Sequence, residues 1–408
     1  KKLLAFVVDS VKNMNDVKVL RRVYGAEFYL ISLHAPHDER WLRMKQYKNW
    51  SDKDRAEFEK CDEIDSDEKV YNPSVGDAGQ QVSKVVAIAD YHIANTQNRE
   101  QLARHGTRLV NLLFGYGSSQ ATFHERSMHL AFSAARRSYC LSKQVGAAIV
   151  DLGGNVLGIG HNDVPKAGGG LYSSETIDKR CYVIGDCRCT NDTNKQERFE
   201  ALENEICSGL GLEDKEKLGQ IIRSSQFREL TEYCRAVHAE MEAIISVSRN
   251  PSRSTVDAIM YVTTYPCHNC TKHILCSGIK KVVYIEPYPK SLAEELHSDA
   301  IVFFGRDGEG CSDRLQFLPY EGVAPHMFDD FFSMIGERKD KTGRLIQKTR
   351  VEVVDSPFFA RELRMRARGG DSSEPTTIGE MQVFNSYIKA VEEERSKQKG
   401  KERVDGGQ

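Results

Sequence analysis

The sequence lacks three features that would each point to a particular class of protein. It has no apolar run long enough to cross a membrane, so we expect no membrane partner. It has no G-x-x-x-x-G-K-[ST] phosphate-binding motif. It has almost no net charge, with 57 Lys and Arg against 59 Asp and Glu. Because proteins that bind nucleic acid usually carry a basic excess, this balance disfavours a polynucleotide partner.

Disulfide bonds are not expected either. The eleven cysteines are an odd number, and no signal peptide precedes them. We therefore expect a reducing, cytoplasmic environment in which thiols are available to bind metal. The sequence opens with two lysines and then an apolar run, without an initiator Met, so we expect it to begin inside a domain.

The length of 408 residues predicts two or three domains. Residues 1–116 alternate strand and helix patterns, which is typical of a parallel α/β sheet. Glycines and serines at 115–119 mark the boundary to a second domain at 117–340, which carries an insertion at 163–235. Residues 341–408 form a C-terminal extension whose charged end we expect to be disordered. In the first domain the expected strands are 3–8, 28–33 and 91–94, and the expected helices are 16–24, 37–44 and 98–114.

The second domain begins with a capping box, in which Thr122 and Glu125 are three residues apart at the start of a helix. A β-hairpin follows around Gly153 and Gly154. After residue 237 helices and strands alternate again, as in βαβ units. The expected strands are 145–150, 155–159, 259–262, 282–285 and 301–304, and the expected later helices are 239–248, 267–277 and 292–297.

The residues with the strongest chemical signal are His238, Cys267 and Cys270. The two cysteines are three apart at the start of a predicted helix, so both sulfurs lie on one face, where the helix N-terminus favours thiolates. His238 opens another predicted helix and offers an imidazole nitrogen. Three protein ligands leave the fourth position of a tetrahedral zinc ion open for water, which is typical of a catalytic site.

Glu240 lies two residues after the histidine and is the predicted proton shuttle. Its motif, His-x-Glu followed by Pro-Cys-x-x-Cys, is the signature of zinc-dependent deaminases. The 25 residues from Met241 to Tyr265 leave room for one helix and one strand between the two halves. The competing interpretations are a purely structural zinc site and an inactive, degenerate site.

Residues 121–335 resemble the deoxycytidylate deaminase family. The resemblance implies a mixed five-stranded sheet flanked by helices, a zinc-bound catalytic centre, and a homo-oligomer such as a hexamer. It also implies that Asn162 contacts the nucleoside. The segments that carry the resemblance are 144–150, 160–162, 237–240, 265–270 and 278–284.

Residues 1–114 resemble the P-loop fold of nucleoside-monophosphate kinases, through segments 7–13, 28–36 and 89–95. Because the phosphate-binding motif is missing, a regulatory or nucleotide-sensing role is expected. The fusion of the two regions resembles bacterial anti-phage dCTP deaminases. That resemblance implies conversion of dCTP, and often dCMP, to the uracil nucleotide, depletion of the dCTP pool, and inhibition by a small RNA.

Three further cysteines in the insertion, Cys181, Cys187 and Cys189, predict a second, structural zinc site, with free thiols as the alternative. The candidate phosphate contacts are Lys166, Arg188, Arg235 and Lys290, with ordinary surface charges as the alternative. Two other functions stay open at this point. One is a deaminase of tRNA or single-stranded DNA, and the other is an inactive nucleotide-binding or RNA-binding regulator. An intact Glu240 argues against the second.

Overall fold

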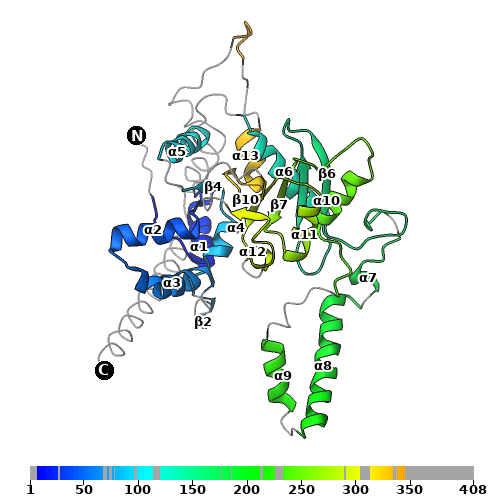
Figure 1. Cartoon of the computed structure of the whole chain (residues 1–408). Helices are drawn as coiled ribbons and strands as arrows, with labels where there is room; N and C mark the ends of the chain where they lie inside the picture. The colour runs from blue at the N-terminus through cyan, green and yellow to red at the C-terminus, as the bar shows by residue number, and fades with distance from the viewer. Residues whose placement is uncertain are drawn as a thin grey trace, which may run out of the picture. The chain divides into compact units, whose positions relative to one another are not determined.

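The structure is a computed structural model of the chain. It describes residues 7–344 apart from gaps at 26–27, 68–70, 73–75, 78, 96–98, 114–119, 176, 185, 212–214, 226–232, 289–290, 304–312, 334–336 and 338. Two compact units divide the chain: residues 1–125 with 320–408 form the first, and residues 126–319 form the second (Figure 1). The predicted domain boundaries at residues 116 and 340 stay predictions, and the units differ from them because 320–332 packs with the first unit.

The first unit contains a three-stranded sheet of order β1-β4-β11, with β1 at Ile31–His34, β4 at Tyr91–Ala94 and β11 at Gly322–Val323. β1 and β4 are parallel, as the alternation of strand and helix patterns predicts, whereas β11 is antiparallel to β4. A kinase-like P-loop fold is not established by this small sheet. The other elements are α1 (Met14–Tyr24), α2 (His37–Lys48), a 3-10 helix (Asp52–Asp54), α3 (Arg55–Asp67), β2 (Tyr71–Asn72), β3 (Gly76–Asp77), α4 (Val82–Ala87) and α5 (Arg99–Leu113).

The predicted strand at 3–8 is absent from its two described residues. Val7 and Val8, at the end of the predicted strand 3–8, have no regular structure and are exposed. The rest of that strand, the glycine-rich boundary and the C-terminal extension beyond residue 344 lie outside the described residues.

Buried polar groups hold the first unit together. The carboxylate of Asp90 accepts the backbone N–H of Leu30 at 2.7 Å and pairs with Arg21 at 2.8 Å. Glu125, whose side chain is fully buried, accepts the N–H of Thr122 and pairs with Arg108. The hydroxyl of Thr122 accepts the N–H of Glu125 at 3.2 Å in return, which confirms the predicted capping box.

The second unit contains a six-stranded mixed sheet of order β6-β5-β7-β8-β10-β9. β5 is antiparallel to β6 and β7, and the pairs from β7 to β9 are parallel. The prediction of five strands is therefore wrong by one. The strands are β5 (Gly146–Val150), β6 (Val156–His161), β7 (Ile259–Thr264), β8 (Lys281–Glu286), β9 (Ile301–Phe303) and β10 (Leu315–Pro319).

The missed strand is β10, which lies between β8 and β9 and pairs with both. It is short and ends at Pro319, which weakens its strand signal. Its inward-facing residues Leu315 and Phe317 are buried in the main core, and Gln316 between them is not. A parallel strand inserted out of chain order cannot be placed from local pattern alone.

Helices cover both faces of this sheet. α10 (Ala239–Ser248) packs on β6, where a Cβ added at Gly160 would overlap the carbonyl oxygen of Ala239. α6 (Phe123–Ala135) packs on β5, where a Cβ at Gly146 would overlap the carbonyl of Ala131. Gly160 pairs with Ala147 rather than Gly146, so the two helices lie on opposite faces. The remaining helices of this unit beside the sheet are α11 (His268–Cys276) and α12 (Ala293–Leu296). In the first unit, residues 325–332 form a 3-10 turn and α13 (Phe328–Phe332).

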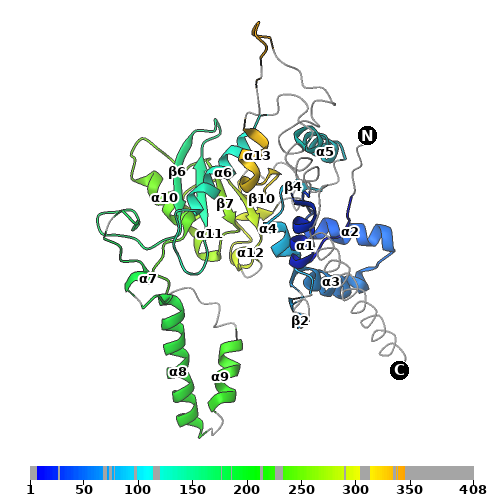
Figure 2. The ribbon, with the colours of Figure 1, turned by 180° about the vertical axis from the view of Figure 1, so that it is seen from behind.

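The insertion contains helices that the sequence did not predict. These are α7 (Cys181–Ile184), α8 (Thr190–Leu210) and α9 (Lys215–Ser224), of which α8 and α9 lie side by side (Figures 1 and 2). Arg223 of α9 pairs with the buried Glu203 of α8 at 3.0 Å. Polar and charged residues surround α8 on most sides, so it shows no clear apolar stripe. No described helix is long and apolar enough to cross a membrane.

Candidate active site

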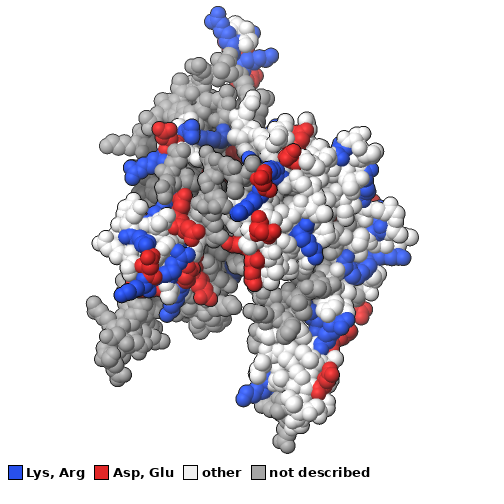
Figure 3. All heavy atoms as spheres, viewed as in Figure 1, with Lys and Arg blue, Asp and Glu red and all other residues white. Residues whose placement is uncertain are grey.

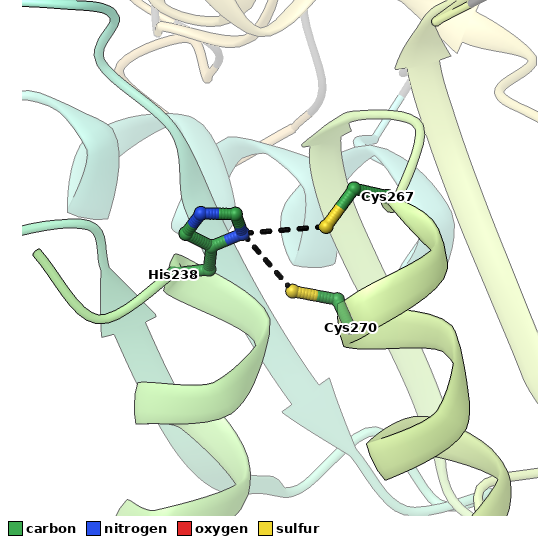
Figure 4. A group of neighbouring side chains, drawn as sticks. All are labelled: His238, Cys267 and Cys270. Carbon is green, nitrogen blue, oxygen red and sulfur yellow. Dashed lines mark hydrogen bonds between the residues drawn. The ribbon is translucent and has the colours of Figure 1, made fainter. Parts of the chain in front are cut away.

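Two helix N-termini bring the predicted metal ligands together. His238 is the N-cap residue of α10, and Cys267 is the N-cap residue of α11. Neither side chain makes a capping hydrogen bond to its own helix, so both are available for another partner. Figure 4 shows the imidazole of His238 pointing at the sulfurs of Cys267 and Cys270. The close contact between β6 and α10 fixes the position of the histidine.

The spacing of these three side chains fits a metal ion. The Nδ1 atom of His238 lies 3.2 Å from the sulfur of Cys270 and 3.5 Å from that of Cys267. All three ligand atoms are within 4.8 Å of one another. In a tetrahedral zinc site with bonds of about 2.0 Å to nitrogen and 2.3 Å to sulfur, nitrogen and sulfur ligands are about 3.5 Å apart. The donor set therefore suits zinc with one position left open.

Hydrogen bonds within the group shift the pKa values of its members. Hydrogen bonds from Cys270 and His238 lower the pKa of the Cys267 thiol to about 4, against the opposing effect of burial. The hydrogen bond to Cys267 raises the pKa of His238 to about 9. Cys267 is thus held as a thiolate, which is the form that binds metal.

Glu240, in the first turn of α10, is a buried carboxyl group beside these ligands. It is 4% exposed and hydrogen-bonds with Cys270. Burial raises its pKa, with nearby His238 acting in the opposite direction. A carboxyl group in this setting can both accept and hold a proton next to the metal position, as general acid–base catalysis requires.

Asn162 follows β6 and has a structural role in this conformation. Its side-chain oxygen accepts the N–H of Val145 at 2.7 Å, and its amide donates to the carbonyl of Lys143 at 2.7 Å. Both polar ends of the side chain therefore hold the segment that leads into β5. Its predicted contact with a nucleoside stays a prediction.

The three insertion cysteines are not brought to ligand distance of one another. Across the described residues, one group of three or more His, Cys, Asp or Glu side chains is close enough to hold a metal, and it consists of His238, Cys267 and Cys270. Cys187 is exposed and donates to the carbonyl of Tyr182, and the backbone of Asp186 and Cys187 has positive φ. The predicted set of Cys181, Cys187 and Cys189 is not assembled in the structure.

A buried ion cluster next to the site was missed by sequence reasoning. The guanidinium of Arg180 pairs with Asp163 at 3.3 Å and with Asp178 at 2.7 Å, and its side chain is 5% exposed. Asp163 also accepts the N–H of Tyr139 at 3.0 Å. These contacts join the insertion to the end of β6. The sequence could have pointed to Asp163, because it directly follows the candidate site residue Asn162. No local sequence pattern predicts that Arg180 is its partner.

Lys166 lines a hollow of about 380 Å³ in the same unit. Arg137 and Arg249 are also in its wall, with Glu242, which pairs with Arg249 at 2.8 Å. The hollow is therefore rich in basic groups. Lys290, another candidate phosphate contact, lies outside the described residues.

Comparison with known proteins places the site in a family. Residues 121–286 match the family described as the cytidine and deoxycytidylate deaminase zinc-binding region. The chain is 31% identical over 166 residues to a deoxycytidylate deaminase of Enterobacteria phage T4, a match that covers 40% of this chain and 78% of the phage protein. It is 27% identical over 161 residues to the Homo sapiens deoxycytidylate deaminase, covering 40% and 63%.

A solved dCMP deaminase from the cyanophage S-TIM5 matches 49% of this chain and 100% of its own, with 17% identity and a TM-score of 0.27. That score carries no structural argument, so the assignment rests on the sequence relatives. The extent and identity of the match to the phage T4 protein, together with the zinc-binding motif residues, show that this chain belongs to the deoxycytidylate deaminase family.

Proposed function

We propose that this protein hydrolyses the C4 amino group of free deoxycytidine nucleotides, releasing ammonia and the corresponding uracil nucleotide. The observation that carries the proposal is the buried Glu240 carboxyl beside the group formed by His238, Cys267 and Cys270. Membership in the deoxycytidylate deaminase family supports the choice of substrate.

His238, Cys267 and Cys270 would hold a zinc ion, because their nitrogen–sulfur separations and open fourth position suit this metal. When bound, zinc would supply a nucleophile by lowering the pKa of a water molecule to about 7. Glu240 takes up the proton at a carboxylate oxygen and holds it because burial raises its pKa. The same carboxyl then delivers this proton to ring N3. It takes up a second proton from the hydroxyl group added at C4, as that oxygen becomes the carbonyl, and passes it to the departing amine as the C4–N bond breaks.

We extend the proposal to dCTP as well as dCMP, with depletion of the dCTP pool as an antiviral defence. The support is the resemblance of the fused regions 1–114 and 121–335 to bacterial anti-phage dCTP deaminases. A homo-oligomer and an inhibitory small RNA remain predictions of the same resemblance. A polynucleotide substrate is disfavoured, since 57 Lys and Arg are balanced by 59 Asp and Glu. Figure 3 shows side chains of both signs on the face in view.

The test is a product assay on zinc-loaded full-length protein. The substrates offered in parallel are dCTP, dCMP, CTP, deoxycytidine and a cytosine-containing oligonucleotide. Formation of dUTP or dUMP is the expected result. Turnover of the oligonucleotide alone would overturn the proposal, and turnover of dCMP without dCTP would remove its antiviral extension.

A further inference from the structure

A second set of thiols lies in the unit that holds the candidate active site. One small cavity is lined by Cys140, Cys181, Cys189 and Cys234. The three candidate ligands of the active site do not line it. They come from three separate segments of the chain: the segment after α6, the start of the insertion and its end. None of the four is in a disulfide.

One direct thiol–thiol contact and several contacts through neighbouring residues connect the four cysteines. Cys140 and Cys234 share a hydrogen bond, which lowers the pKa of Cys140 to about 6. Cys189 interacts electrostatically with Cys234, and its sulfur lies 3.7 Å from the hydroxyl oxygen of Ser142. Cys181 accepts a hydrogen bond of 3.2 Å from Thr190, the residue after Cys189. Each thiol thus lies beside another thiol or beside that thiol's immediate neighbour.

Cys189 has a particular position within this cluster. It is the N-cap residue of α8, a helix of 21 residues, and its side chain makes no capping hydrogen bond. Serine, threonine, aspartate and asparagine are the usual N-caps because they accept that bond, so a cysteine here is not explained by helix capping. The positive end of a long helix does favour a thiolate.

We propose that Cys140, Cys181, Cys189 and Cys234 form a structural zinc site that closes the base of the insertion. Four cysteine ligands complete a tetrahedral shell and leave no position for water, which is the composition of a structural rather than a catalytic zinc site. The site shares Cys181 and Cys189 with the set predicted from sequence, and replaces the exposed Cys187 by two cysteines outside the local cluster.

In this proposal, metal binding brings the four sulfur atoms closer together than they are in the structure. No three of these sulfurs lie within 4.8 Å of one another in the described structure, whereas sulfur ligands of one zinc ion are about 3.8 Å apart. The metal therefore draws the segment of Cys181 and Cys189 onto Cys140 and Cys234. It joins the two ends of the segment that carries α8 and α9, and closing such a long loop stabilises the fold. Cys234 lies four residues before His238, so the zinc also anchors the segment that leads into the active site.

The experiment measures metal content of the full-length chain by mass spectrometry after zinc loading under reducing conditions. Wild type is expected to hold about two zinc ions per chain, one per site. Cys189→Ser and Cys234→Ser should each hold about one, as should Cys267→Ser, which removes a ligand of the other site. Cys187→Ser is the matched control from the same segment and should keep the wild-type content. One zinc per wild-type chain, or unchanged content in Cys189→Ser and Cys234→Ser, overturns the proposal.

A second measurement does not depend on how well the Cys189 and Cys234 variants fold. Cobalt is loaded into Cys267→Ser, and absorption from tetrahedral cobalt bound to four thiolates is recorded. Its presence supports the site, and its absence overturns it. Because the readout is independent of deamination, it separates a failure of this inference from a failure of the proposed activity.

Discussion

Gly160 of β6 faces the carbonyl oxygen of Ala239 so closely that a methyl group would not fit between them. In the sequence, Ala239 lies between the proposed ligand His238 and the proposed proton shuttle Glu240. Because Gly160 has no side chain, the sheet can approach closely the helix that carries these candidate site residues.

Gly160→Ala is expected to push α10 away from β6 and to lower activity at least tenfold. Overpacking of this kind costs about 1–3 kcal/mol or more in the free energy of unfolding. Gly153→Ala in the hairpin turn is the control, because its Cβ would meet only side-chain atoms at 3.3 Å or more. Urea unfolding and the deamination rate provide the measurements. Wild-type activity in Gly160→Ala would show that the close contact does not position the site.

Removal of the metal is expected to abolish activity reversibly. Chelation should inactivate wild type, and added zinc should restore it. His238→Ala should be inactive and should lose the metal of this site, because two sulfurs alone are an incomplete ligand set. Activity that survives exhaustive chelation, with metal content verified, would contradict the assigned role of His238, Cys267 and Cys270.

Arg180→Met should destabilise the second unit strongly. It leaves Asp163, whose side chain is 1% exposed, without its cationic partner, and breaking a buried pair costs about 3–5 kcal/mol. Insertion residues should become more susceptible to proteolysis at the same time. Arg188→Met is a control within the insertion, at a residue for which the structure gives no buried ion pair. Equal urea midpoints for the two variants would show that the buried cluster adds no stability.

The first unit should lose stability as the pH falls from about 6.5 to about 4. Burial lowers the pKa of His92 to about 4, with His326 adding to this effect and Asp90 opposing it. Its ring is hydrogen-bonded to Ser32 at 2.8 Å. Over this range the unfolded chain binds a proton that folded His92 does not, so stability present above pH 6.5 is lost on acidification, by up to about 3 kcal/mol.

Tryptophan fluorescence can follow this transition, because both tryptophans, Trp41 and Trp50, lie in the first unit. His92→Gln should flatten the dependence of the urea midpoint on pH between 6.5 and 4. An unchanged slope in this variant would assign the pH dependence to other groups.

Sequence patterns predicted much of the second unit, since its strands β5 to β8 and helices α10 and α11 have strong local signals. They also singled out His238, Cys267 and Cys270, which the structure brings together, because a metal site constrains residue type and spacing together. Long-range relationships were out of reach. Three features depend on how segments distant in the sequence meet. They are the position of β10 between β8 and β9, the ion pair of Arg180 with Asp163, and the contact of Cys140 with Cys234.

Asn162 shows a different limit of sequence reasoning. The resemblance to the deaminase family marked it as a site residue, but the sequence could not show that both ends of its amide are bound by the main chain of 143–145. The α8–α9 pair was missed because polar residues on α8 mask the periodicity from which helices are recognised.

The most direct test of the account compares wild type with Glu240→Gln at equal, verified zinc content, measuring the uracil nucleotide formed from dCMP. Wild type should form dUMP, and the variant should be slower by a factor of roughly 100 or more, since it keeps the metal ligands but cannot carry a proton. Equal rates in the two proteins, or no dUMP from zinc-loaded wild type, would contradict the proposed deamination mechanism.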